Sequence, residues 1–222
     1  MNGGFIRHPR ELIVAMAVGL LAPASAMADM SALSVTGMSD QGSVVSATIT
    51  LNWNGTDLIA MIANTSADNS VITGFGLMGG SISGDTTFTA SGTANDGVWF
   101  GANNLSMTPP GEFGTFQFGG DTPPPGLNAG DPNAGVVAGS TATFTFANLL
   151  SDNVSALDFL TLSNSNGLAV ALRFQRVGAN GEESAKVAGS GGGQVVPIPA
   201  PGAAMLGMIG FAMVGWVRRR FL

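Results

Sequence analysis

Several side chains that carry much of protein chemistry are missing or nearly so: the chain has no cysteine, no tyrosine and a single histidine, His8. Without cysteine, the fold holds no disulfide and no thiolate-bound metal. Beyond residue 28 the chain therefore lacks the usual general bases, the residues that activate a nucleophile and the usual transition-metal ligands. These absences exclude a Ser-His-Asp triad, and we expect a protein that is not an enzyme and that needs no cofactor.

Basic residues are also scarce, with 8 Lys and Arg against 14 Asp and Glu. Two arginines precede the first apolar run, and three, at 218–220, follow the last. The long middle region keeps only Arg173, Arg176 and Lys186 against thirteen acids, a formal net charge of −10. Because such a surface repels phosphate backbones, nucleic acid is not an expected partner.

Helical patterns are rare in the middle region, whereas strand patterns are frequent. No long amphipathic stretch rich in Glu, Lys, Leu and Arg occurs, which argues against a helical bundle. Residues 45–53 alternate between apolar and polar side chains, which predicts a strand with one buried face. Asn54-Gly55 follows, a strong hairpin signal, and residues 58–62 are the expected return strand.

Further short segments carry the same strand signals, separated by turn residues. They are residues 71–77, 86–89, 98–100, 113–118, 141–146 and 168–174. Residues 119–139 hold several prolines and glycines and are expected to form a surface loop. The pattern predicts an all-β antiparallel sandwich, of which a jelly-roll-like arrangement is one form. A β-solenoid is the alternative, but no repeat of fixed period supports it.

The N-terminal segment has the three parts of a secretory signal peptide. Residues 7–10 are basic, and residues 12–21 form an apolar run that is too short to span a bilayer. Ala26 and Ala28 then supply the small-x-small pattern that signal peptidase accepts, which makes Asp29 the expected first mature residue. A second small-x-small triplet lies two residues earlier and is a rival cleavage site.

The C-terminal segment has the features of a short membrane anchor. Residues 201–217 carry no charge and are followed at once by Arg218, Arg219 and Arg220. As a helix, this stretch reaches about 25 Å at 1.5 Å per residue, slightly short of a hydrocarbon core. The arginines should stay on the cytoplasmic side, which leaves the middle region outside the inner membrane.

A proline motif stands just before the apolar stretch: Val196, Pro197, Ile198, Pro199 and Ala200. Together with the short apolar segment and the arginine cluster, it resembles the tail of the PEP-CTERM class of exported bacterial proteins. Ile198 stands where the class usually has Glu, as in the Val-Pro-Leu-Pro-Ala variant of the tail. The resemblance implies recognition and cleavage by a membrane-embedded exosortase, in cells that make exopolysaccharide.

These features predict four parts: a signal peptide (1–28), a β-sandwich surface domain (29–188), a Gly-rich linker (189–195) and a sorting tail (196–222) whose transmembrane helix covers residues 201–217. The precursor is expected to be anchored in the inner membrane with its domain outside. The mature form is then expected at the cell surface or in the extracellular matrix.

Three readings of the middle region stay open. The first is a non-enzymatic surface or matrix protein associated with exopolysaccharide or biofilm. The second is a binding module for carbohydrate, with Trp53 or Trp99 as a stacking platform, or for Ca²⁺, with Asp121 and Asp131 as oxygen ligands in one loop. The third is a secreted hydrolase that uses paired carboxylates, whose arrangement in space the sequence cannot test.

Overall fold

In the computed structural model, the chain is described at residues 29–94, 98–107, 113–123, 127, 130–190 and 196–198. The expected signal peptide and the expected transmembrane stretch lie outside these residues. Among the described residues, no helix combines the length and the apolar character needed to cross a membrane.

The described strands form two sheets, and all strand pairs are antiparallel. The first, which we call sheet A, has the order β12 (Val196–Ile198), β1 (Asp29–Met38), β2 (Val44–Trp53), β3 (Leu58–Asn64), β9 (Thr141–Ala147), β5 (Thr87–Ser91). The second, sheet B, has the order β11 (Glu183–Ser190), β10 (Leu168–Val177), β4 (Val71–Leu77), β7 (Thr115–Asp121), β6 (Phe100–Ser106), with β8 (Val136–Val137) paired to β4. The predicted all-β antiparallel sandwich is thus confirmed.

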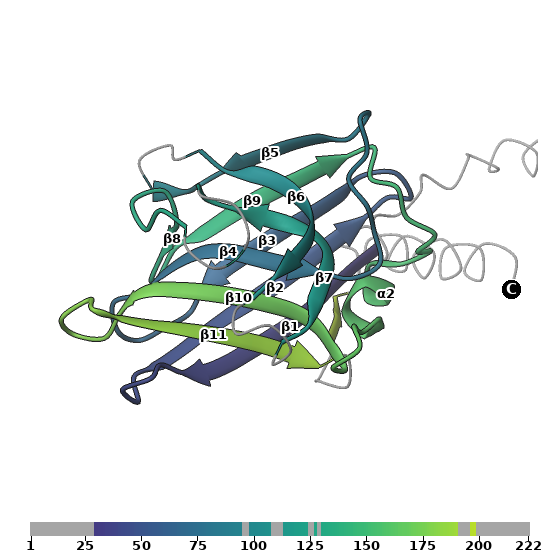
Figure 1. Cartoon of the computed structure of the whole chain (residues 1–222). Coiled ribbons are helices and arrows are strands. Elements are labelled where there is room, and N and C mark those ends of the chain that lie inside the picture. The colour runs from purple at the N-terminus through teal and green to yellow at the C-terminus, as the bar shows by residue number, and fades with distance from the viewer. Residues whose placement is uncertain are drawn as a thin grey trace, which may run out of the picture.

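The two sheets pack face to face, and a short helix, α2 (Ala156–Thr161), lies at one end of the sandwich (Figure 1). Burial alternates along β2 and β3, so every second side chain points into the space between the sheets. Aromatic rings fill that space: Phe75 lies 4.8 Å from Phe144, and Phe118 lies 5.2 Å from Phe146, centroid to centroid. These contacts place the hydrophobic core between the sheets.

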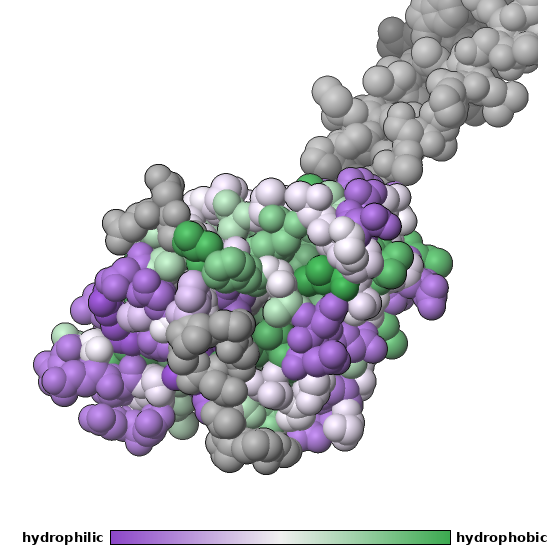
Figure 2. All heavy atoms as spheres, turned by 45° about the horizontal axis from the view of Figure 1, so that its top comes forward, coloured by the Kyte–Doolittle hydropathy of each residue, from purple (hydrophilic) through white to green (hydrophobic). Residues whose placement is uncertain are grey.

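The sandwich has two long sides where the sheet edges meet. On one side β1 lies next to β11, and Gly37 allows the close approach, because a Cβ there would stand 2.7 Å from Val187. On the other side β5 lies near β6, and Phe88 packs against Gly101. Figure 2 shows apolar residues gathered over this second side, where Phe100 is half-exposed.

The hairpin prediction at residues 44–62 is confirmed, with β2 paired to β3 and Gly55 at φ 94° in the turn. The predicted strand at residues 98–100 is displaced, since β6 begins only at Phe100. The expected surface loop at 119–139 is wrong near both ends: its first three residues belong to β7, and residues 136–137 form β8. The expected linker begins later than predicted, because β11 continues to Ser190.

A second hydrophobic cluster covers the outer face of sheet B. Met107, Phe116 and Leu127 are fully buried there, together with Ala171 of β10. Residue 127 belongs to the predicted surface loop, which therefore packs on the sheet instead of standing free in solvent. The reason is that β4 offers glycines at 74 and 76, whose missing side chains leave room for Leu127 and Phe116.

Candidate functional site

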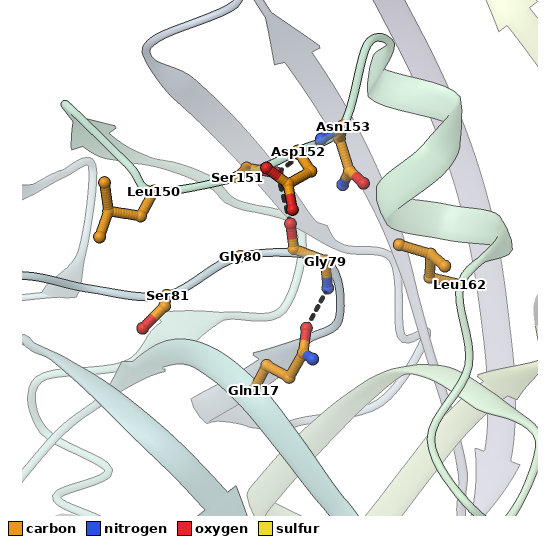
Figure 3. A pocket seen from close by; sticks show the side chains of 9 residues that line it. All are labelled: Gly79, Gly80, Ser81, Gln117, Leu150, Ser151, Asp152, Asn153 and Leu162. Atoms are coloured by element: carbon orange, nitrogen blue, oxygen red, sulfur yellow. Dashed lines mark hydrogen bonds between the residues drawn. The ribbon is translucent and has the colours of Figure 1, made fainter.

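The best-defined pocket opens at the end of the sandwich near α2 (Figure 3). It has a volume of about 370 Å³. Its walls come from the segment after β4, from β7, from the segment before α2 and from the residue that ends α2. The lining residues are Gly79, Gly80, Ser81, Gln117, Leu150, Ser151, Asp152, Asn153 and Leu162.

Gly79 is the centre of this arrangement. Its φ of 90° lies in the left-handed region, and a Cβ at this position would stand 2.3 Å from Nδ2 of Asn153. Its backbone N–H donates to Oε1 of Gln117 at 2.6 Å, and its carbonyl accepts from the hydroxyl of Ser151. Only glycine meets both the backbone conformation and the close contact, so the pocket wall depends on this residue.

Two further contacts hold the opposite wall in place. Ser81 and Leu150 exchange backbone hydrogen bonds of 2.8 and 3.2 Å, which tie the two segments together. The indole N–H of Trp53 donates to the carbonyl of Asn153 at 3.0 Å. The pocket is therefore anchored to the core of the sandwich through a buried tryptophan.

The pocket combines polar and apolar groups without a basic residue. Asp152 and Gln117 are exposed and offer an acceptor and an amide, while Leu150 and Leu162 are 59% and 44% exposed beside them. Such a mixture of hydrogen-bonding groups and aliphatic surface suits a hydroxyl-rich neutral ligand. Asp152 is the only carboxylate in the lining, so this pocket does not provide the two carboxylates that glycoside hydrolysis uses.

The tryptophan stacking platform, one of the readings that the sequence left open, does not form at Trp53 or Trp99. Trp53 is 3% exposed and packs edge-on against Phe159, at 5.2 Å between centroids. Trp99 is 7% exposed, lies 4.6 Å from Phe144 and donates its indole N–H to the carbonyl of Ala134. Both rings are part of the core, because an indole in a sandwich interior gains apolar burial and still finds a carbonyl partner.

Asp121, one of the two expected calcium ligands, lies at the end of β7 and is 0% exposed. Its Oδ2 accepts from the backbone N–H of Leu127 at 2.8 Å. Gly74 leaves room for this carboxylate, because a Cβ there would lie 2.6 Å from Oδ1. Burial lowers the pKa of the nearby Arg173 guanidinium, and the negative charges of Asp121 and Asp40 oppose that shift. Asp121 thus balances a cation on β10.

Asp131, the other expected ligand, has a local role. Its Oδ1 accepts from the backbone and side-chain N–H groups of Asn133, at 2.8 and 2.9 Å, which is the pattern of an Asx-turn. In the part of the chain that the structure describes, no three His, Cys, Asp or Glu residues lie together as metal ligands. Within the described residues, the carboxylates of Asp121 and Asp131 are thus each engaged by a backbone N–H group of their own loop.

The cations of the middle region gather on one hairpin, which sequence reasoning missed. Arg173 of β10 stands directly opposite Lys186 of β11, and Arg176 follows on β10. Arg176 donates to Oδ1 of Asn133 at 2.8 Å. Glu183 begins β11 and accepts a hydrogen bond from the hydroxyl of Ser39. Only the register of β10 and β11 could have revealed this grouping.

The structure describes three of the five residues of the proline motif. Residues 196–198 form β12, whose backbone pairs with β1 through Ser31↔Pro197 and Ala32↔Val196. Pro199, Ala200 and the three arginines lie outside the described residues, as do Ala26 and Ala28. At the other end of the domain, β1 begins at Asp29, the residue that follows the expected cleavage site.

Comparison of the chain with protein-family models, with curated proteins and with solved structures finds no significant match.

Proposed function

We propose that this chain is an exported, non-enzymatic bacterial surface or matrix protein that is sorted through its C-terminal tail and associates with exopolysaccharide. One observation carries the proposal. The part of the sandwich from β1 to β11 lies between the two expected processing signals: Asp29 of β1 follows Ala28, and β11 ends at Ser190, ahead of the proline motif. Processing at both ends would release β1 to β11 as one domain and would cut the chain at β12, which lies inside the proline motif.

The sequence supports the non-enzymatic role. The region from Asp29 onward has neither histidine nor cysteine nor tyrosine, so acid–base or nucleophilic chemistry would have to rely on carboxylates, lysine or hydroxyls. The three cations between residues 29 and 200 include Lys186, which stands in a sheet opposite another cation, and Arg173, whose charge Asp121 balances. These positions suit structural roles.

Mass spectrometry of the surface form from native cells tests the proposal. We expect an N-terminus at Asp29 and a C-terminus near Val196. Replacing Pro197 and Pro199 by alanine should leave the unprocessed chain in the inner membrane, since two prolines hold the extended backbone that a protease reads. Pro132→Ala, outside the motif, is the matched control. A surface form that still ends at Leu222 would overturn the proposal.

Membrane topology gives an independent test. A reporter fused after Leu222 should stay cytoplasmic in the precursor, because Arg218, Arg219 and Arg220 resist translocation. A reporter that is active only in the periplasm, fused at the same position, should be inactive. Periplasmic activity of that fusion would contradict the proposed orientation.

A second candidate function, saccharide binding, is favoured by the pocket next to α2. Asp152 and Gln117 stand beside the two half-exposed leucines, which is the combination that hydroxyl groups and sugar CH faces require. Trp53 reports on this pocket, because its indole bonds to Asn153. Neutral oligosaccharides should change the tryptophan fluorescence of the protein, and Asp152→Ala should remove the change. Asp85→Ala, at an exposed turn, is the control that should respond like the unaltered chain.

A further inference from the structure

The outer face of sheet A has a regular chemical pattern. One row of neighbours across the strands reads Thr50 on β2, Met61 on β3, Thr143 on β9 and Ser91 on β5. The next row has Asn52, Ile59, Thr145 and Thr89 in the same strand positions. We call these two rows the hydroxyl face. Its side chains are partly or fully exposed, and it has an aliphatic band on β3 with hydroxyls on the flanking strands.

The hydroxyl face carries no charge, although the domain is strongly acidic. In the five long strands of sheet A, only Asp29, at the start of β1, is charged. The other acids of the described domain lie in loops, in α2 or in sheet B. A neutral ligand on this face would meet no charge that has to be desolvated, whereas an acidic polymer would be repelled by the acids around it.

Several hydroxyls of this face have no hydrogen-bond partner among the described residues. Ser34 and Thr48 at the β1 side share a hydrogen bond of 3.0 Å. In contrast, the structure shows no side-chain partner for Thr89, Thr143 or Thr145 in the described part of the chain. These hydroxyls are therefore open to a ligand, and each threonine methyl adds apolar surface beside its hydroxyl.

The geometry of a sheet repeats these groups at fixed intervals. Adjacent strands lie about 4.8 Å apart, and same-face residues on one strand recur at about 6.7 Å. A neutral polysaccharide is also a repeating ligand, with CH faces and hydroxyl edges in alternation. A chain that crosses the strands would place one CH face on the aliphatic band of Ile59 and Met61 and its hydroxyls beside the threonines on either side.

We propose that the hydroxyl face binds a neutral polysaccharide that lies across β2, β3, β9 and β5. This inference deepens the proposed association with exopolysaccharide and rests on it. A second copy of the chain is the other possible occupant of a flat face. It would bring two domains of formal net charge −10 together, and their mutual repulsion opposes that pairing.

Co-sedimentation tests the proposal with the full-length chain, purified in mild detergent. The probes are an insoluble neutral β-glucan and a cross-linked uronate gel of the same particle size. We expect binding to the β-glucan and none to the uronate. Thr143→Glu, which places a charge in the centre of the face, should weaken β-glucan binding about tenfold, equivalent to ~1.4 kcal/mol. Thr143→Ser keeps the hydroxyl and should bind within about twofold of the unaltered chain, a difference well below that threshold.

Ser106→Glu on β6 of sheet B is the matched control, because it adds the same charge at an exposed strand position away from the face. It should bind like the unaltered chain. Thermal melts establish that each variant is folded. Equal β-glucan binding by Thr143→Glu would overturn the proposal, as would equal binding to the uronate gel. A dimer in size-exclusion chromatography that Thr143→Glu dissociates would assign the face to a second copy instead. Sorting is measured separately, by mass spectrometry of the processed termini. The sorting proposal and the polysaccharide-binding proposal can therefore fail independently of each other.

Discussion

At position 79 the absence of a side chain is a condition for the pocket next to α2. Gly79 has φ 90°, and a Cβ there would stand 2.3 Å from the Asn153 amide. Gly79→Ala should lower the free energy of unfolding by about 1–3 kcal/mol, because alanine is strained in this conformation and must displace the amide. Chemical denaturation measures the change. Gly84→Ala is the control, since a Cβ at 84 meets nothing within 4 Å; a loss of stability there as large as at 79 would contradict this account.

At Asp121 a buried carboxylate compensates the positive charge of Arg173. Asp121→Asn keeps the size of the side chain and an oxygen for the N–H of Leu127 but removes the charge that faces Arg173. We expect a loss of about 1–3 kcal/mol, less than for a fully buried ion pair because Arg173 is partly exposed. Denaturant titration beside Asp85→Asn, an exposed carboxylate, gives the comparison. Equal effects at 85 and 121 would show that the charge of Asp121 has no special partner.

Among the elements, β12 is the one whose pairing links the domain to its tail. The Cα atoms of Ala32 and Val196 are partners in the β1–β12 ladder, within the range that a disulfide bridges. Because the chain has no cysteine, the double variant Ala32→Cys, Val196→Cys contains one possible disulfide. We expect it to form under mild oxidation and to be visible on a non-reducing gel.

The double variant Ser34→Cys, Val196→Cys is the control, since Ser34 lies two residues further along β1, beyond disulfide reach of Val196. Cross-linking of both pairs to the same extent would mean that β12 does not hold this register.

The charge of the whole molecule gives a prediction that no single residue carries. The thirteen acids of the middle region outnumber its three cations, and the excess negative charge repels itself in the compact state. Sodium chloride screens this repulsion, so a higher salt concentration should raise the melting temperature. The expected rise is about 2–4 °C for each kcal/mol that screening adds to the free energy of unfolding. Calorimetry with an equal osmolality of a neutral solute is the control. A melting temperature that falls with salt would show that attractive pairs dominate.

The sequence by itself determined the class of the fold and the strands with regular alternation. Residues 44–53 and 71–77 form β2 and β4 with the predicted bounds. In β2 the apolar side chains recur at the period of a pleated strand, whereas β4 is a short run rich in β-branched and aromatic residues that is buried throughout. β1 and β11 escaped prediction, since small and polar residues interrupt their patterns and the two strands come together, with Gly37 against Val187, only in the folded sandwich. A local pattern does not contain that information.

Only the tertiary structure decided where chemistry is available. Tryptophan side chains such as Trp53 and Trp99 can stack on a sugar ring when they are exposed. In this fold Trp53 packs against Phe159 and Trp99 against Phe144, which removes both from solvent. The pocket near Gly79 and the hydroxyl face each join segments that are tens of residues apart in the chain. Side-chain types follow from the sequence, but their grouping depends on which strands pair and in what register, and long-range pairing is selected by burial of the whole core.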